Sequence, residues 1–446
     1  MKSKLTLKET IVVASTLFGM FFGAGNLIFP VHLGQMAGSN SWPAIIGFCI
    51  TAVSIPILAV AAIGNTHSAD LFELSSKVTG WYGLIFTTLL YLTIGPFFAI
   101  PRCATVSFTT GLEPMLSGSS IRLGQLLFTF VFFAVVMFFS LKPSGITIWI
   151  GKIINPIFLL FLGILVAVAL FNPGAPVSQV EPVESYANGA FFNGFVEGYG
   201  TMDAIAGLAF GIVIINVVRG LGIEEDNDVA RQTLKAGIFT GILMAFIYIL
   251  TIIMGAQSRG LFELSDNGGI ALTQISGHYL GGFGMLILAL TITFACLKTA
   301  IGLVTSCSEM FVKIFPGKFS YRGWAILFTV FSFAVSNVGL TAIISYAIPF
   351  LMLLYPLVTV LIVMALLEKT FDKSRYVYVC TTIGAFIPAV FDCLKTMPEG
   401  IQAALGIPAL AEIGSRLFPF FDLGLGWVVP SVIGCIIGLV LKKIKN

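Results

Sequence analysis

Long apolar runs recur from one end of this sequence to the other, and they restrict its fold more than any other feature. A run of about 18–20 apolar residues is long enough to cross the roughly 30 Å hydrocarbon core of a bilayer. Only 10% of the 446 residues are charged and mean hydropathy is +1.00, whereas soluble domains carry about 25% charged residues. We therefore predict an all-α polytopic membrane protein with about 12 transmembrane helices, at residues 9–33, 41–64, 81–111, 121–141, 145–171, 190–218, 231–256, 279–310, 322–337, 341–367, 375–393 and 424–441.

The Lys and Arg residues between these spans orient them. If the N-terminus is cytoplasmic, the outer loops hold only Arg122, Arg259, Lys395 and Arg416. Arg102 and Lys298 lie inside spans, and every other Lys and Arg falls on the inner side. Because cytoplasmic loops carry an excess of Lys and Arg, we predict a multi-pass protein of the cell membrane with both termini in the cytoplasm.

Two spans are interrupted by glycine near their middle. The first reads Gly19-Met20-Phe21-Phe22-Gly23-Ala24-Gly25-Asn26, and the sixth reads Glu197-Gly198-Tyr199-Gly200-Thr201-Met202-Asp203. A Pro-containing linker at 172–189 separates the first ten spans into two groups of five, so each interruption falls at the start of a group. This pattern is typical of transporters with inverted repeats. It predicts a first five-helix repeat at 9–171, a second, inverted one at 190–367, and two accessory helices at 375–441, within a single transmembrane transporter domain over 1–446.

An interruption of this kind creates a polar site inside the membrane. It exposes backbone N–H groups at the start of one half-helix, which attract a carboxylate, and carbonyls at the end of the other, which attract a cation. The alternative is that Gly19 with Gly23, and Gly207 with Gly211, form close-packing faces on unbroken helices. Two interruptions in matching positions favour broken helices.

The eighth span carries polar residues at helical spacing. Lys298, Gly302, Thr305, Ser306 and Glu309 fall on one face of it. Two adjacent hydroxyls beside a free carbonyl make a neutral oxygen site that suits a monovalent cation. In the alternative interpretation these hydroxyls bond back to carbonyls of their own helix or pack against a neighbour.

Four charged residues lie within predicted spans: Arg102, Lys298, Glu197 and Asp203. A charge at the centre of a span costs roughly 2.5–3.5 kcal/mol on insertion scales, so such residues usually face the interior of a bundle or water. They are either structural ion pairs or parts of a coupling or gating network. The sequence contains neither a GxSxG nor an HExxH motif, which argues against an enzyme. No cofactor or nucleic-acid partner is indicated, and the oligomeric state stays open.

The segment Phe21-Phe22-Gly23-Ala24-Gly25-Asn26-Leu27-Ile28-Phe29-Pro30 resembles the signature of the bacterial branched-chain amino acid:cation symporters, the LIVCS family. The third and sixth spans, around Gly95–Arg102 and Glu197–Asp203, are similar to those of the same family, and the resemblance covers nearly the whole chain. It implies a LeuT-type fold of five plus five inverted helices followed by two more. It also implies leucine, isoleucine and valine as substrates.

The resemblance further implies a site for each ligand. Na⁺ would be bound by carbonyls of Gly19, Phe22 and Gly302 and by the hydroxyls of Thr305 and Ser306. The substrate's carboxylate would lie near the amides of Ala24, Gly25 and Asn26. Its ammonium group would meet the carbonyls of Gly198, Tyr199, Gly200 and Thr201.

We therefore expect a symporter that works by alternating access in a lipid membrane. Na⁺ is favoured as the coupling ion because the five expected ligands include no carboxylate. Some members of the family are described as proton-coupled, and here Lys298 or Asp203 would be the titratable carrier. The alternatives from other classes are a channel, a membrane-embedded enzyme, and a nutrient sensor built on a transporter fold.

Overall fold

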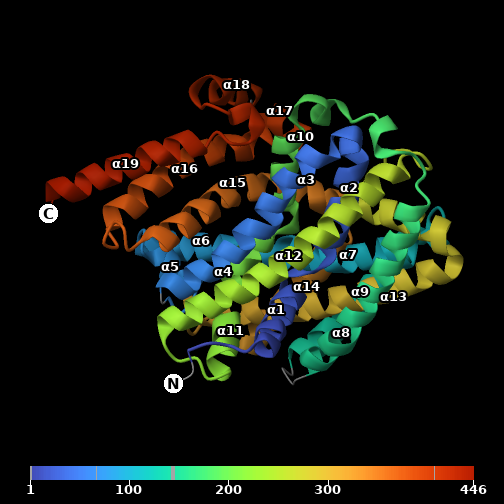
Figure 1. Cartoon of the computed structure of the whole chain (residues 1–446), viewed down its shortest axis with the longest axis horizontal. Helices are drawn as coiled ribbons and strands as arrows, with labels where there is room; N and C mark the ends of the chain where they lie inside the picture. Colours follow the sequence, from blue (N-terminus) through green and yellow to red (C-terminus); the bar gives the residue numbers. More distant parts are fainter. Residues whose placement is uncertain (1–2, 67, 142–145, 406, 446) are drawn as a thin grey trace.

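The computed structural model describes residues 3–66, 68–141, 146–405 and 407–445, and all its regular elements are helical (Figure 1). The predicted all-α class is confirmed. The α-helices are α1 Leu7–Phe21, α2 Ala24–Ala37, α3 Ser41–Cys49, α4 Ile55–Thr66, α5 Leu71–Ser76, α6 Gly80–Leu92, α7 Ala99–Gly111, α8 Ser120–Ser140, α9 Ile146–Phe171, α10 Glu184–Glu197, α11 Asp203–Gly220, α12 Asp226–Ser258, α13 Gly268–Ile314, α14 Tyr321–Ser336, α15 Leu340–Leu367, α16 Arg375–Lys395, α17 Glu399–Leu405, α18 Ile407–Leu417 and α19 Val428–Lys445.

Several of these helices are joined end to end by short turns of other helix types. The π-helical turns η2 (Ile50–Ser54) and η3 (Thr93–Phe97) join α3 to α4 and α6 to α7. A 3₁₀ turn, η6 (Gly198–Thr201), joins α10 to α11. Each predicted span corresponds to one helix or to such a joined set, except the first, which consists of α1 and α2 separated by the non-helical Phe22 and Gly23. Residue 145 lies outside the described residues.

Helical segments long and apolar enough to cross a membrane number seven among the described residues. The bent pair Asp203–Gly211 and Val213–Gly220, which meet at 48°, makes an eighth. Leu159–Phe171 and Tyr321–Ser336 are shorter apolar helices. The remaining predicted spans are the interrupted first span and α19, which ends in Lys442, Lys443 and Lys445.

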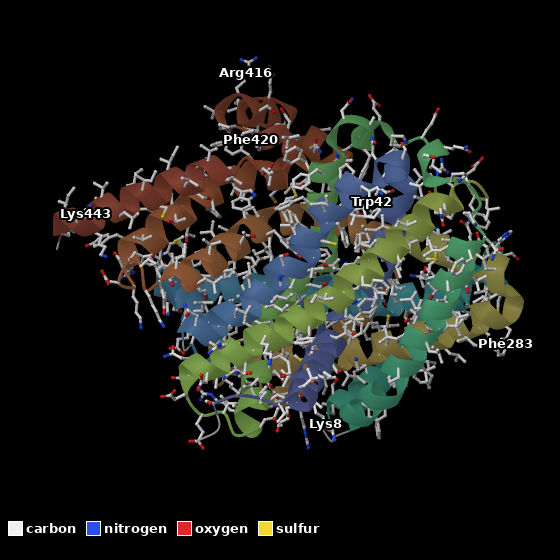
Figure 2. The ribbon with its side chains drawn as sticks, in the orientation of Figure 1. Lys8, Trp42, Phe283, Arg416, Phe420 and Lys443 are labelled. Carbon is white, nitrogen blue, oxygen red and sulfur yellow. The ribbon has the colours of Figure 1, made fainter. Side chains whose placement is uncertain are left out.

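The outer helices present apolar side chains on the surface of the molecule. Phe130 of α8 is 61% exposed, Ile242 of α12 65% and Ile436 of α19 55%. Water would hydrate such faces poorly, whereas the acyl chains of a bilayer cover them without cost. α16 and α19 pack side by side on one flank of the molecule, and α16 also packs on α15 (Figure 1). In Figure 2, Lys8 lies at the lower edge and Lys443 at the left, Arg416 lies at the top and Phe283 at the right, and Trp42 lies in the upper part of the view.

At each interrupted span, one helix pair approaches closely enough to bring backbone against backbone. A Cβ built on Gly34 of α2 would lie 2.0 Å from the Ile252 carbonyl oxygen of α12. From the opposite side, a Cβ on Gly255 would lie 2.1 Å from the carbonyl oxygen of Val31. Gly47 of α3 and Gly194 of α10 meet in the same reciprocal way, each against a carbonyl of the other helix. Small residues permit this contact between helices in membranes, and here they join a half of each interrupted span to a continuous neighbour.

The long helix α13 consists of two parts separated at Gly281, whose φ is +62°. We call residues 268–280 the outer helix. Its N-cap is Asn267, whose side chain accepts hydrogen bonds from the N–H groups of Gly269 and Ile270. The helix begins directly after Asn267 because that side chain supplies the capping oxygen.

The outer helix and the segment before it rest on α2. A Cβ at Gly268 would lie 1.8 Å from the carbonyl oxygen of Ile28. The ring of His32 lies with Nε2 3.0 Å from the carbonyl oxygen of Ser265, and the N–H of Ser265 donates to the side chain of Gln35 at 3.2 Å. These contacts couple the position of α2 to that of the outer helix.

Candidate functional site

Both predicted interruptions are real breaks in their helices. α1 ends at Phe21, Phe22 is extended (φ −72°, ψ 97°), and α2 begins only at Ala24. In the sixth span, η6 is followed by Met202 in the left-handed conformation (φ 64°) before α11 begins. Positive φ is uncommon for a residue other than glycine, so the surrounding contacts hold this turn in place. The N-termini of α2 and α11 thus begin inside the molecule.

Glycines 207 and 211, which were candidates for close packing, lie beyond the break of the sixth span, and α11 bends by 48° directly after Gly211. Both lie within the first part of α11, downstream of the break. A Cβ on Gly207 would lie 2.8 Å from the carbonyl oxygen of Pro56, and one on Gly211 would lie 3.0 Å from Ile63. The alternative interpretation therefore holds for this pair, which packs α11 onto α4, while the break itself lies around Gly198–Met202.

Asn26 connects the two breaks. Its Oδ1 accepts the N–H of Gly23 at 2.9 Å, and its Nδ2 donates to Asp203 Oδ2 and to the Tyr248 hydroxyl, each at 2.5 Å. The Tyr248 hydroxyl in turn donates to Asp203 at 3.3 Å. Asn26 and Asp203 are each only 2% exposed, and Tyr248 is fully buried. One amide thus satisfies polar groups of the first, sixth and seventh spans, where an unpaired group would be costly.

Arg102 reaches the same junction from α7. Its Nη1 donates to the carbonyl oxygen of Gly200 at 2.6 Å, and its Nη2 lies 3.5 Å from that of Thr201. The guanidinium lies over the ring of Phe29, 5.3 Å from its centroid, and the side chain is 4% exposed. Two of the four carbonyls that the resemblance assigned to the substrate's ammonium group, those of Gly200 and Thr201, therefore accept from a side-chain cation of the protein.

Two glycines at this junction are required by its packing. A Cβ on Gly25 would lie 2.8 Å from Nη2 of Arg102, and one on Gly200 would lie 2.5 Å from the ring of Phe29. Tyr199 turns the other way: its ring stacks on Tyr355 of α15, with centroids 4.0 Å apart. The structure therefore brings Gly25, Asn26, Arg102, Gly200, Thr201 and Asp203 together, with Ala24 in the first turn of α2 and Gly198 at the start of η6.

The polar face predicted on the eighth span lies in the part of α13 that follows Gly281. Thr299 is the α13 residue that lies against Gly23, with its Oγ1 3.4 Å from a Cβ built there. Gly302 is exposed and has open space in front of it, while Thr305 and Ser306 are half-buried. The Thr305 hydroxyl donates to the carbonyl of Ile301 at 2.9 Å, which is the back-bonding that we considered as the alternative.

Lys298 is half-buried on the same helix, and Glu197 is the last residue of α10, directly before the break.

Sequence reasoning missed Tyr248 and Thr299. A single tyrosine in a long apolar helix and a lone threonine one turn before Gly302 give no signal of their own, because the breaks that they face are distant in the sequence.

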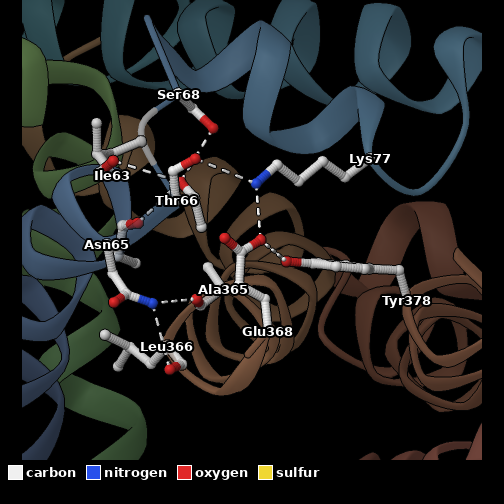
Figure 3. Close-up of polar contacts among 10 residues, drawn as sticks. Ile63, Asn65, Thr66, Ser68, Lys77, Ala365, Leu366, Glu368 and Tyr378 are labelled. Carbon is white, nitrogen blue, oxygen red and sulfur yellow. Dashed lines mark hydrogen bonds and ion pairs between the residues drawn. The ribbon is translucent and has the colours of Figure 1, made fainter. Parts of the chain in front are cut away.

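A second buried polar cluster lies at the ends of α4 and α15 (Figure 3). Glu368, which is completely buried, accepts from Lys77 Nζ at 2.7 Å and from the Tyr378 hydroxyl at 3.3 Å. Lys77 also donates to the carbonyl of Thr66, and Asn65 donates to the carbonyls of Ala365 and Leu366. The hydrogen bonds of Lys77 and Glu368 thereby connect the segment after α5 to α4, α15 and α16. A separate ion pair joins Asp70, which caps α5, to Lys313 near the end of α13.

Replacing Glu368 by glutamine is expected to lower the free energy of unfolding by about 2 kcal/mol. Breaking a buried pair costs about 3–5 kcal/mol, and here Lys77 is still 24% exposed, so water compensates in part. The unfolding midpoint in detergent measures the effect. The double variant with Lys77→Gln should recover part of the loss, and Asp372→Asn, which breaks an exposed pair with Lys442, serves as the control. Equal midpoints for Glu368→Gln and Asp372→Asn would contradict this account.

Comparison with known proteins shows similarity along almost the whole chain. The sequence pattern of the family described as "Branched-chain amino acid transport protein" matches residues 6–445. The chain is 48% identical to the "Branched-chain amino acid permease BrnQ" of Lactobacillus delbrueckii subsp. lactis, over 99% of this chain and 100% of that protein. It is 40% identical to the protein of the same name from Bacillus subtilis (strain 168), over 100% and 99% of the two chains.

Solved structures show the same fold at low sequence identity. Mhp1, described as a nucleobase-cation-symport-1 family transporter, superposes in a closed conformation with a TM-score of 0.61 at 14% identity, over 98% of this chain and 92% of the other. MhsT in complex with L-phenylalanine gives a TM-score of 0.53 at 16% identity, over 96% and 98%. Both have the LeuT-type fold, so the fold predicted from the resemblance is confirmed.

Proposed function

The chain belongs to the branched-chain amino acid transport protein family, and from this premise we propose that it imports leucine, isoleucine and valine by cation symport. Its relatives are permeases rather than enzymes. In our proposal the protein lies in the cell membrane with both termini in the cytoplasm, and its apolar faces contact lipid. The substrate binds where the first and sixth spans are broken, and access alternates between the two sides.

The observation that carries this proposal is the buried junction of the two breaks. Asn26 holds Gly23, Asp203 and Tyr248 together, so one half of each broken span, α2 and α11, meets the other at this point. The first-turn N–H groups of α2 have no partners within their helix, and they carry the positive end of its dipole. Such groups bind an anion well. The junction therefore offers a carboxylate a site inside the molecule.

The cation site is proposed between α1 and α13. Gly23 contacts Thr299. Gly19 lies in the last turn of α1, just before the break, and Gly302 lies about one turn beyond Thr299 on α13. We place the ion between these two segments, with Phe22, Thr305 and Ser306 close by in the sequence. A carbonyl and hydroxyl ligand set without a carboxylate suits Na⁺, and we favour Na⁺ over H⁺.

Proton coupling remains the second candidate, with Asp203 or Lys298 as the carrier. Either ion would supply the same driving force, because an inside-negative potential of 100 mV contributes about 2.3 kcal/mol per unit charge. One cation could then support an accumulation of roughly 50-fold.

Uptake of labelled leucine into proteoliposomes, with Na⁺ and proton gradients imposed separately, tests this proposal. We expect a Na⁺ gradient alone to drive accumulation. Thr305→Ala should reduce Na⁺-driven uptake at least about tenfold, because it removes one of the few ligands of the ion. Thr370→Ala removes a hydroxyl from an exposed turn and should leave uptake unchanged.

Each outcome assigns the coupling differently. If only a proton gradient drives uptake and Thr305→Ala is tolerated, the cation site is wrong, and Asp203 and Lys298 become the residues to replace. Counterflow with unlabelled leucine separates a carrier from a channel, since only a carrier exchanges substrate across the membrane with saturation. Recovery of chemically unchanged leucine excludes an enzyme. A protein that binds leucine and transports none would be a sensor.

A further inference from the structure

Arg102 is a cation without an anionic partner among the described residues. It forms no ion pair there, and its strongest contact is with the neutral carbonyl of Gly200 at 2.6 Å. Its Nε, also buried, has no hydrogen-bond partner in the described part of the chain. Asp203 is near enough to attract the guanidinium electrostatically, but the hydrogen bonds to its Oδ2 come from Asn26 and Tyr248. A buried charge that is satisfied only in part is costly unless a further partner binds.

The guanidinium lies directly beside the first turn of α2. Nη2 is so close to Gly25 that a Cβ there would come within 2.8 Å of it. The N–H groups of that turn have no partners within the helix. Two independent sources of positive potential, a side-chain cation and a helix N-terminus, therefore meet at one point inside the protein.

The only negatively charged group of a branched-chain amino acid is its carboxylate. Placed at this point, it would receive charge-assisted hydrogen bonds from the guanidinium, which are the stronger kind. An ammonium group at the same point would face a fixed positive charge, and the carbonyls of Gly200 and Thr201 already accept from Arg102. The geometry thus opposes an ammonium group at the carbonyls of Gly200 and Thr201, which are two of the four that the resemblance implied for it.

We propose that Arg102 binds the carboxylate of the substrate, together with the first-turn amides of α2. This inference rests on the proposed function and refines it. Arg102 is then a substrate-binding residue, whose guanidinium is positioned by the carbonyls of η6 and the ring of Phe29. The site selects zwitterionic amino acids over amines of the same shape, and the ammonium points away from η6.

Competition against labelled leucine on the purified protein tests this selection without requiring transport. In the wild-type protein, unlabelled leucine should compete at least about 30-fold better than leucinamide or 3-methylbutan-1-amine, which lack the negative charge. Arg102→Gln should weaken leucine by a similar factor and change leucinamide by less than about threefold. Arg102→Lys keeps the charge and should retain the preference at lower affinity. Arg122→Gln, at an exposed position on α8, should match the wild type.

The outcomes separate this inference from the proposed function. If leucinamide or the amine competes as well as leucine in the wild-type protein, Arg102 does not bind the carboxylate, and this holds even if the Arg102 variants fail to fold. Equal weakening of leucine and leucinamide in Arg102→Gln would assign Arg102 a purely structural role. A wild-type protein that binds no branched-chain amino acid would overturn the proposed function, and this inference with it.

Discussion

Replacement of Asn26 by leucine is expected to abolish leucine accumulation, with the initial rate falling at least about 100-fold. The variant removes the acceptor of the Gly23 N–H and a donor to Asp203, and each buried polar group left unpaired costs about 1–3 kcal/mol. The relative position of the two breaks would then no longer be fixed, and the site would lose its geometry. Initial uptake rates in proteoliposomes, normalised to the amount of reconstituted protein, measure the effect.

Exchange of the two partners provides the sharper test of the same contact. Asn26→Asp alone puts two carboxylates side by side and should be as inactive as the leucine variant. Combined with Asp203→Asn, it again places one amide beside one carboxylate, and the carboxylate introduced on α2 can still accept the N–H of Gly23. The double variant should therefore recover part of the activity, as expected for residues in direct contact. Asn172→Leu, at the exposed end of α9, is the control. Near-normal uptake by Asn26→Leu would refute the role of this bridge.

A valine at Gly255 is expected to prevent correct folding. Its Cβ would lie 2.1 Å from the carbonyl oxygen of Val31. Overpacking usually costs about 1–3 kcal/mol because side chains can move aside. Here the obstacle is backbone within a helix, so α2 and α12 would have to separate along their contact. We expect a loss above about 3 kcal/mol, seen as an aggregated peak in size-exclusion chromatography or a strongly lowered unfolding midpoint.

Gly163 of α9 supplies the matched control for this experiment. It lies within a span and has no atom within 4 Å of a built Cβ, so Gly163→Val should fold normally. Gly34→Val tests the contact from the other side and should behave as Gly255→Val does. A stable, active Gly255→Val protein would show that α2 and α12 do not pack this closely.

The positions of both breaks could be predicted from the sequence because their cause is local. Glycine-rich segments with Gly23 and Gly198 in the middle of apolar spans weaken the helix where they occur. The third span is likewise kinked where Gly95 precedes Pro96, since Gly95 is non-helical within the π turn η3. The sequence of a single segment therefore shows whether its span is broken and where its charged residues lie.

The partners of the charged residues could not be predicted, because they depend on which helices become neighbours. Glu368 pairs with Lys77, 291 positions away. Arg102 meets backbone carbonyls rather than an acidic side chain, and no residue-type pattern indicates a carbonyl as partner. The ligands expected for the coupling ion at Gly19, Phe22, Gly302, Thr305 and Ser306 stay a prediction, as do the repeat boundaries.

The contacts between the outer helix and α2 would make the outer helix a target for inhibitors of transport. Gly268 touches Ile28 without room for a methyl group, and Ser265 bonds to both His32 and Gln35. α2 therefore cannot tilt unless the outer helix moves with it. Gln274 and His278 are exposed on that helix, at the face that lies outside the cell in our proposed orientation. An antibody fragment clamped there could arrest the transport cycle without competing for the substrate and without entering the cell.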